Sequence, residues 1–149
     1  MKKYYIASGS GQSKYQLVAF DNALIQAGLS NYNLVRVSSI LPAMATRRQY
    51  VDLELGIPLH TAYATVSSNT PGEKIATAIA VGIPKMETNI GVIMEGVGDT
   101  ADETAEVARQ MVMEAMNNHG IEIDRVEFSA VEGTVEDGYL SLVSAIAMW

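Results

Sequence analysis

The sequence predicts an α+β protein in which two stacked, mainly antiparallel β-sheets each carry one helix on the outside. Periodicity gives the element order β-α-β-β-β-β-α-β-β, with only two helices among the strands. Residues 73–83 form a strand with bulky residues on one face and small residues on the other, so layers should lie above and below it. Two helices cannot cover both faces of one large sheet, whereas two stacked sheets satisfy the pattern.

The first helix follows a short strand and a loop. Residues 3–7 are aromatic and β-branched and predict a strand, whereas residues 8–13, rich in glycine and serine, indicate a loop. Residues 16–27 place Leu17, Phe20, Leu24 and Ala27 at helical spacing, which predicts that these four form the buried face. Gly28 is suited to end that helix.

The middle of the chain contains strands separated by irregular segments. Residues 32–41 predict one strand, which Pro42 ends, and residues 43–58 are irregular. Residues 61–66 predict the next strand, and a turn sequence at 69–72 leads into the alternating strand 73–83.

The last part repeats the strand–helix alternation. Residues 89–95 predict a strand, and Thr100 and Glu103 form a capping-box pattern that opens a helix to about Asn118. Residues 124–131 and 139–148 predict the final two strands.

Composition limits the possible functions. The 149 residues suit a single domain, 1–149, and their 48% hydrophobic content predicts surface that is buried in a homo-oligomer. No apolar run is long enough for a membrane span, and none follows the N-terminal lysines as in a signal peptide. The net charge of −7 argues against nucleic acid as a partner, and the lack of cysteine excludes disulfides and suits a cytoplasmic protein.

Two familiar kinds of site are not supported. The glycines at residues 9 and 11 lack the spacing to Lys14 that a phosphate-binding loop requires. His60 and His119 are the only histidines and neither lies in a cluster with ligand spacing, so we expect no metal site.

Two carboxylates and two serine pairs remain as candidates. Asp21 interrupts an apolar helical segment, and Glu95 ends an apolar strand. Apolar surroundings raise a carboxyl pKa towards the range of a general acid, although such a residue, taken alone, is more often an exposed one at the edge of its element. The pairs 38–39 and 67–68 both follow a valine and cannot be distinguished by composition.

An ordered set of segments makes the first serine pair the stronger candidate. Residues 33–42, Asn-Leu-Val-Arg-Val-Ser-Ser-Ile-Leu-Pro, resemble the processing site of the pyruvoyl-dependent arginine decarboxylases. Further resemblance follows in family order at residues 19–24, 27–28, 61–63, 71–73, 78–85, 91–95, 130–132 and 149. The resemblance implies a four-layer αββα sandwich assembled as a trimer, with active sites between neighbouring subunits.

The same resemblance implies a self-cleaving enzyme. Ser39 would attack the carbonyl of Ser38, dividing the chain into a β chain, 1–38, and an α chain, 39–149. Residue 39 would become a covalent pyruvoyl group, with no metal and no pyridoxal phosphate. L-arginine would form a Schiff base with it and lose CO2 to give agmatine, for polyamine synthesis or acid resistance.

Family roles can be assigned to individual residues only where this sequence matches. Glu95 corresponds to the residue proposed to protonate the carbanion, and Asn33 to a donor near the processed bond. Asp21 would face the substrate guanidinium, and Leu24 and Ile93 would line the pocket. The alternatives are the same chemistry on lysine or ornithine, or an unprocessed binding or structural protein.

Overall fold

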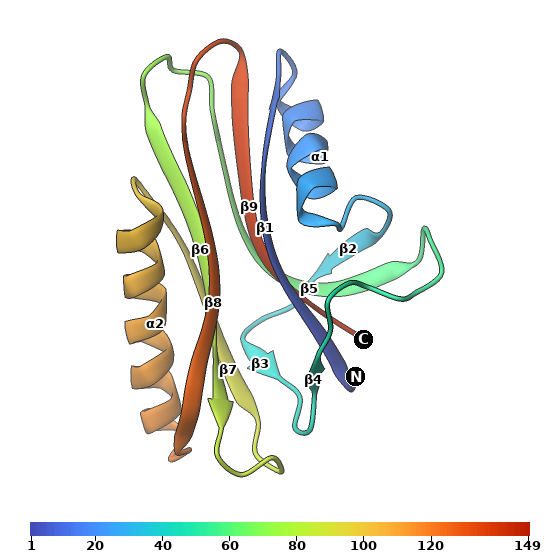
Figure 1. Cartoon of the computed structure of the whole chain (residues 1–149), viewed down its shortest axis with the longest axis vertical. Coiled ribbons are helices and arrows are strands. Elements are labelled where there is room, and N and C mark those ends of the chain that lie inside the picture. Colours follow the sequence, from blue (N-terminus) through green and yellow to red (C-terminus); the bar gives the residue numbers. More distant parts are fainter.

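A computed structural model describes residues 1–149, and its two stacked sheets each have a helix on the outer side (Figure 1). The first sheet has the strand order β2-β5-β9-β1-β4 and the second β3-β7-β6-β8. The predicted α+β class and the four αββα layers are therefore confirmed. The elements are β1 (Lys3–Ser13), α1 (Gln16–Ala27), β2 (Asn33–Arg36), β3 (Ile40–Leu41), β4 (Thr46–Arg47), β5 (Pro58–Ser68), β6 (Lys74–Pro84), β7 (Gly91–Gly98), α2 (Ala101–Asn118), β8 (Ile123–Thr134) and β9 (Tyr139–Met148).

Strand β6 shows why the layers form. Its bulky residues Ile79 and Val81 belong to the apolar cluster between the two sheets, whereas Ala78 and Ala80 pack in the cluster under α2. At Gly82 an added Cβ would lie only 2.8 Å from Cγ1 of Val112 on α2. The small face thus admits the helix and the bulky face fills the space between the sheets.

Residues 8–13 are a correction to the sequence-based prediction, because they continue strand β1 instead of forming a loop. A Cβ at Gly9 would collide with the carbonyl oxygen of Ala23, and one at Gly11 with that of Ala19. Glycine therefore occupies the strand where the backbone of α1 packs directly on it. The glycine and serine content reflects this close packing.

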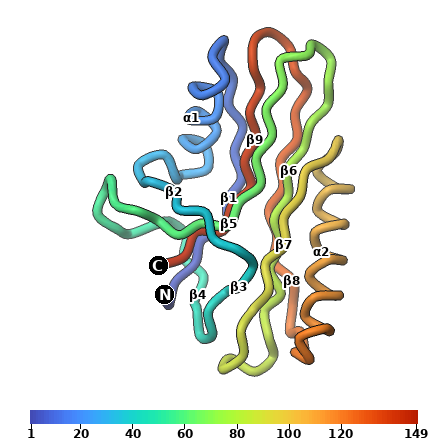
Figure 2. Tube along the Cα trace, turned by 180° about the vertical axis from the view of Figure 1, so that it is seen from behind, coloured from blue at the N-terminus to red at the C-terminus, as the bar shows by residue number.

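Residues 32–41 are a second correction, because they form two short strands in different sheets. Strand β2 pairs in parallel with β5 in the first sheet, and β3 pairs antiparallel with β7 in the second. Between them the chain crosses from one sheet to the other, and this passage can be followed in Figure 2. Residues 43–58 are mostly irregular but contain β4, which pairs in parallel with β1. The other predicted elements agree with the observed ones to within about three residues at each end.

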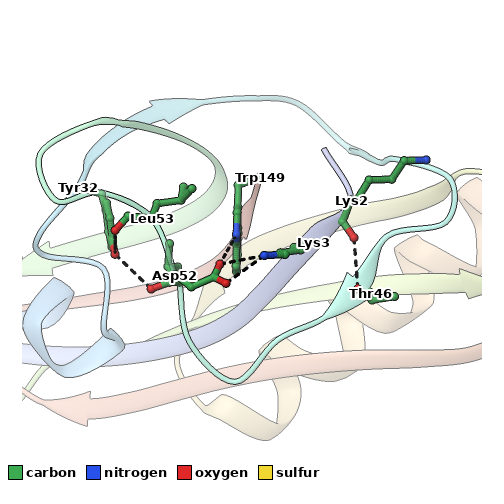
Figure 3. Close-up of polar contacts among 8 residues, drawn as sticks. Lys2, Lys3, Tyr32, Thr46, Asp52, Leu53 and Trp149 are labelled. Carbon is green, nitrogen blue, oxygen red and sulfur yellow. Dashed lines mark hydrogen bonds and ion pairs between the residues drawn. The ribbon is translucent and has the colours of Figure 1, made fainter.

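The loop before β5 is fastened to both ends of the chain (Figure 3). The Asp52 carboxylate accepts hydrogen bonds from Nε1 of Trp149 at 2.6 Å and from Nζ of Lys3 at 3.0 Å. The hydroxyl of Tyr32 donates to the carbonyl oxygen of Val51 at 3.2 Å. We call the Lys3–Asp52–Trp149 group the terminal clasp.

No helix of the protein is long and apolar enough to cross a membrane.

Candidate active site

The Ser38–Ser39 peptide lies where the chain crosses between the sheets. On one side the N–H of Val37 donates to the carbonyl oxygen of Thr61 at 3.2 Å, and on the other the N–H of Ile93 donates to the carbonyl oxygen of Ser39 at 2.7 Å. Neither the Ser38 carbonyl nor the Ser39 N–H forms a backbone hydrogen bond. The peptide group between the two serines therefore forms no backbone hydrogen bond, whereas the groups on either side of it are hydrogen-bonded to Thr61 and Ile93.

The second serine pair has a different environment. Ser67 and Ser68 lie inside β5, opposite Ser141 and Leu140 of β9. The hydroxyls of Ser67 and Ser141 are hydrogen-bonded at 2.9 Å, and the Ser68 hydroxyl donates to Glu73. The ladder holds this pair within a strand, so the structure separates two pairs that composition could not distinguish.

Strand register brings three of the predicted residues to one face. Leu41 of β3 lies opposite Gly91 of β7, and continuing this antiparallel register puts Ser39 opposite Ile93. Ile93 is fully buried in the cluster between the sheets. Because alternate residues of a strand share a face, Glu95 lies on the same side, next along β7.

The Glu95 carboxyl has a pKa above its ordinary value. Although the side chain is exposed in the single chain, neighbouring atoms crowd the carboxyl, and this partial desolvation raises its pKa above the ordinary value. The positive charge of Arg36 acts in the opposite direction and limits the rise. A carboxyl of this kind keeps its proton closer to neutral pH, as a general acid must.

Asp21 lies on an exposed apolar face of α1. The predicted buried face of this helix is partly wrong, because Leu17 is 78% exposed and the helix instead buries Ala19, Ala23, Leu24 and Ala27. The alanines are buried because the backbone of α1 rests on the β1 glycines. The exposed face carries Leu17, Val18, Ile25 and Asp21, the last being the only charged residue of the helix.

Three predicted residues lie apart from Ser39 within one chain. Leu24 packs under α1 on the outer side of the first sheet, in a different cluster from Ile93. The side-chain amide of Asn33 donates to the carbonyl oxygen of Gly56 at 2.7 Å. Asn33 also precedes Ser38 by five residues, up to roughly 16 Å along an extended backbone. Asp21, Leu24 and Asn33 therefore belong to the first sheet and its helix, whereas Ser39, Ile93 and Glu95 belong to the second sheet.

Two further residues at the crossover were not singled out by sequence. The guanidinium of Arg36 lies 4.1 Å from the centre of the Tyr63 ring and donates through Nη2 to the Tyr63 carbonyl oxygen at 2.7 Å. Tyr63 also lines a groove of about 420 Å³ between α1 and β5, together with Leu17 and Phe20. Arg36 lies inside the motif 33–42, but its contact with Tyr63 depends on tertiary structure that no local pattern encodes.

A larger cavity contains none of the predicted residues. It has a volume of about 560 Å³ and is lined by segments around β4 and the β6–β7 turn, including Arg47 and Arg125. These cations already share Glu127, which accepts hydrogen bonds from Nε of Arg125 at 3.0 Å and from the Tyr4 hydroxyl at 2.8 Å. Size alone therefore does not identify the site.

The chain is similar to known proteins over nearly its whole length. The model of the family described as pyruvoyl-dependent arginine decarboxylase matches residues 3–149, which include every predicted site residue. A protein of that name from Methanocaldococcus jannaschii is 40% identical over 145 residues, covering 97% of this chain and 87% of that protein. Another, from Thermococcus kodakarensis, is 35% identical over 150 residues, covering 99% and 95% respectively.

Proposed function

Because this chain belongs to the pyruvoyl-dependent arginine decarboxylase family, we propose that it cuts itself between Ser38 and Ser39 and then decarboxylates L-arginine to agmatine. The observation that carries this proposal is the unbonded Ser38–Ser39 peptide at the crossover, held on either side by Thr61 and Ile93. A carbonyl free of competing hydrogen bonds is open to attack by the neighbouring hydroxyl.

The bonds that form and break in cleavage involve only the two serines and water. The Ser39 hydroxyl attacks the Ser38 carbonyl, and the amide becomes an ester. Elimination then breaks the bond between Cβ and Oγ of Ser39 and releases Ser38 as the carboxylate end of the β chain. Hydrolysis at residue 39 releases ammonia and leaves the pyruvoyl group at the start of the α chain.

The surroundings of residue 39 fit that group. Its carbonyl supplies a point of attachment for the substrate amine and an electron sink for decarboxylation. The buried side chain of Ile93 excludes water beside residue 39, and Glu95, whose pKa is raised, lies on the same face. We assign Glu95 the role of donating a proton to the substrate carbon that has lost CO2.

The cut leaves two fragments that remain interleaved. Residues 1–38 contain β1, α1 and β2, and β1 lies between β9 and β4 in the first sheet. β1 and β9 form ten cross-strand pairs. Just beyond them, the backbones of Lys3 and Trp149, both partners of Asp52 in the terminal clasp, are hydrogen-bonded to each other. Both fragments are therefore required for one folded unit after cleavage.

Arginine recognition is proposed to be completed by a neighbouring subunit of a trimer. Asp21 lies on a face of α1 that otherwise exposes Leu17, Val18 and Ile25, and such a face favours burial against another chain. There Asp21 can receive the substrate guanidinium in a bidentate contact, with Leu24 beside it. Asn33 is engaged by Gly56 within its own chain, so we assign its proposed help in cleavage to the assembled trimer.

Product formation tests the proposed substrate. The processed protein should release CO2 and agmatine from L-arginine, and the same assay with lysine and ornithine sets its specificity. Faster release from either of those amino acids would replace arginine as the substrate while keeping the chemistry. A processed protein inactive on all three would contradict the proposed reaction.

A further inference from the structure

Arg36 is a cation held in place beside the proposed cut. The guanidinium carbon of Arg36 lies 4.1 Å from the centre of the Tyr63 ring, and Nη2 of Arg36 donates to the Tyr63 carbonyl oxygen at 2.7 Å. It forms none of the ion pairs of the protein, all of which involve other side chains. Arg36 is thus positioned by an aromatic ring and a neutral carbonyl, with its charge left uncompensated by a direct counterion.

The position of Arg36 is set by the end of the β2–β5 pairing. Arg36 is the last residue of β2 to pair with β5, opposite Thr61. Its side chain continues along the edge of β5 to Tyr63, whose ring packs with α1 on the outer side of the first sheet. Arg36 directly precedes the crossover, because β2 ends at this residue. Its charge also lowers the pKa of Glu95 on β7.

Negative charge develops two residues from Arg36 during the proposed cleavage. The second step breaks the bond between Cβ and Oγ of Ser39, and the electron pair leaves with Oγ in the new Ser38 carboxylate. The α-proton of Ser39 passes to a base or to water. Ser38 follows Arg36 by two residues, roughly 7 Å between Cα atoms in extended backbone.

We propose that Arg36 binds the carboxylate that leaves on Ser38 and thereby accelerates the elimination step of self-cleavage. This inference rests on the proposed cut at Ser38–Ser39. A planar guanidinium matches both oxygens of a carboxylate, and a donor fixed in advance stabilises developing charge without reorganising. Tyr63 supplies that fixation. The preceding acyl shift forms a neutral ester and gains less from the cation.

The test separates the two steps of cleavage. Arg36→Gln, Arg36→Lys and wild-type precursors are followed by intact mass under denaturing conditions, with and without hydroxylamine, which cuts an ester but not a peptide bond. In Arg36→Gln, α chain bearing pyruvate should form at least about 10-fold more slowly. An ester that hydroxylamine cuts into residues 1–38 and a serine-started 39–149 should accumulate. Arg36→Lys should lie between this variant and wild type.

A matched control keeps the outcomes distinct. Arg48→Gln makes the same change at an exposed arginine and should behave as wild type. Wild-type cleavage kinetics in Arg36→Gln, or slow cleavage without accumulated ester, would overturn the role of Arg36 but leave the proposed cut intact. A wild-type chain that never cleaves would instead overturn the proposed function.

Discussion

The backbone N–H of Ile93 donates a 2.7 Å hydrogen bond to the carbonyl oxygen of Ser39. This bond joins the residue that is proposed to become the cofactor to β7, the strand that carries Glu95. The peptide just before it has no such bond, so cleavage can occur without breaking the sheet. After the cut, residue 39 would remain attached to β7 beside its proposed proton donor.

Replacing Glu95 should separate cleavage from decarboxylation. Glu95→Gln should still yield two fragments, but kcat should fall about 10²- to 10⁴-fold because a general acid is lost. In the wild type, kcat should fall as pH rises through the raised pKa of Glu95, since only the protonated carboxyl can donate. The variant should lack this limb of the pH profile.

The control for this change is Glu114→Gln on the exposed side of α2, which should match the wild type in activity and pH profile. Full activity in Glu95→Gln, or an unchanged pH limb, would remove Glu95 from its proposed role.

Mixed assemblies should reveal whether Asp21 and Glu95 act from different chains. Asp21→Asn and Glu95→Gln homo-oligomers should each be poorly active on arginine. Co-expressed in equal amounts, they should regain activity at about a quarter of the sites, because random assembly pairs two intact residues across an interface with that frequency. Activity that stays at the level of the separate variants would place both residues in the same chain.

The sequence was sufficient for features that local patterns encode. The two faces of β6 and the capping box at Thr100 predicted the layers and the second helix correctly, and the Thr100 side chain accepts from the N–H of Glu103. These patterns depend on neighbours within a few residues, which a sequence displays directly.

Features that depend on distant partners were misread or left open. Gly9 and Gly11 indicated a loop because only the packed α1 shows why a strand needs them. The break between β2 and β3 follows from pairing with two different sheets, to which an apolar run gives no clue. For the same reason, sequence could not distinguish Ser38–Ser39 from Ser67–Ser68 without the family resemblance.

Removing the Asp52 carboxylate from the terminal clasp should lower the stability of the processed protein (Figure 3). Hydrogen bonds from Lys3 and then Trp149 hold the pKa of Asp52 below its ordinary value. A lowered carboxyl pKa stabilises the folded state above the ordinary pKa, and this stability is lost as pH falls through the folded-state pKa. Asp52→Asn should therefore lower the urea midpoint at neutral pH, with the difference shrinking in acid.

Glu54→Gln provides the matched control in the same loop, since that side chain is exposed and forms no ion pair. Equal urea midpoints for Asp52→Asn and Glu54→Gln at neutral pH would show that the clasp contributes nothing to holding the fragments together.

The contact between α1 and β1 should tolerate no added methyl group. A Cβ at Gly11 would collide with backbone atoms of Ala19 and Ala23, which cannot move without shifting the helix. Gly11→Ala should lower the free energy of unfolding by about 1–3 kcal/mol, the usual cost of overpacking. Gly96→Ala, where an added Cβ meets nothing within 4 Å, should change it much less in the same urea titration.

Intact mass of the purified protein under denaturing conditions tests the central claim most directly. The account predicts two species, residues 1–38 and residues 39–149 with pyruvate in place of the first serine, and a single full-length species for Ser39→Ala. A wild-type protein that remains one 149-residue chain after prolonged incubation, or a Ser39→Ala variant that still splits, would contradict it.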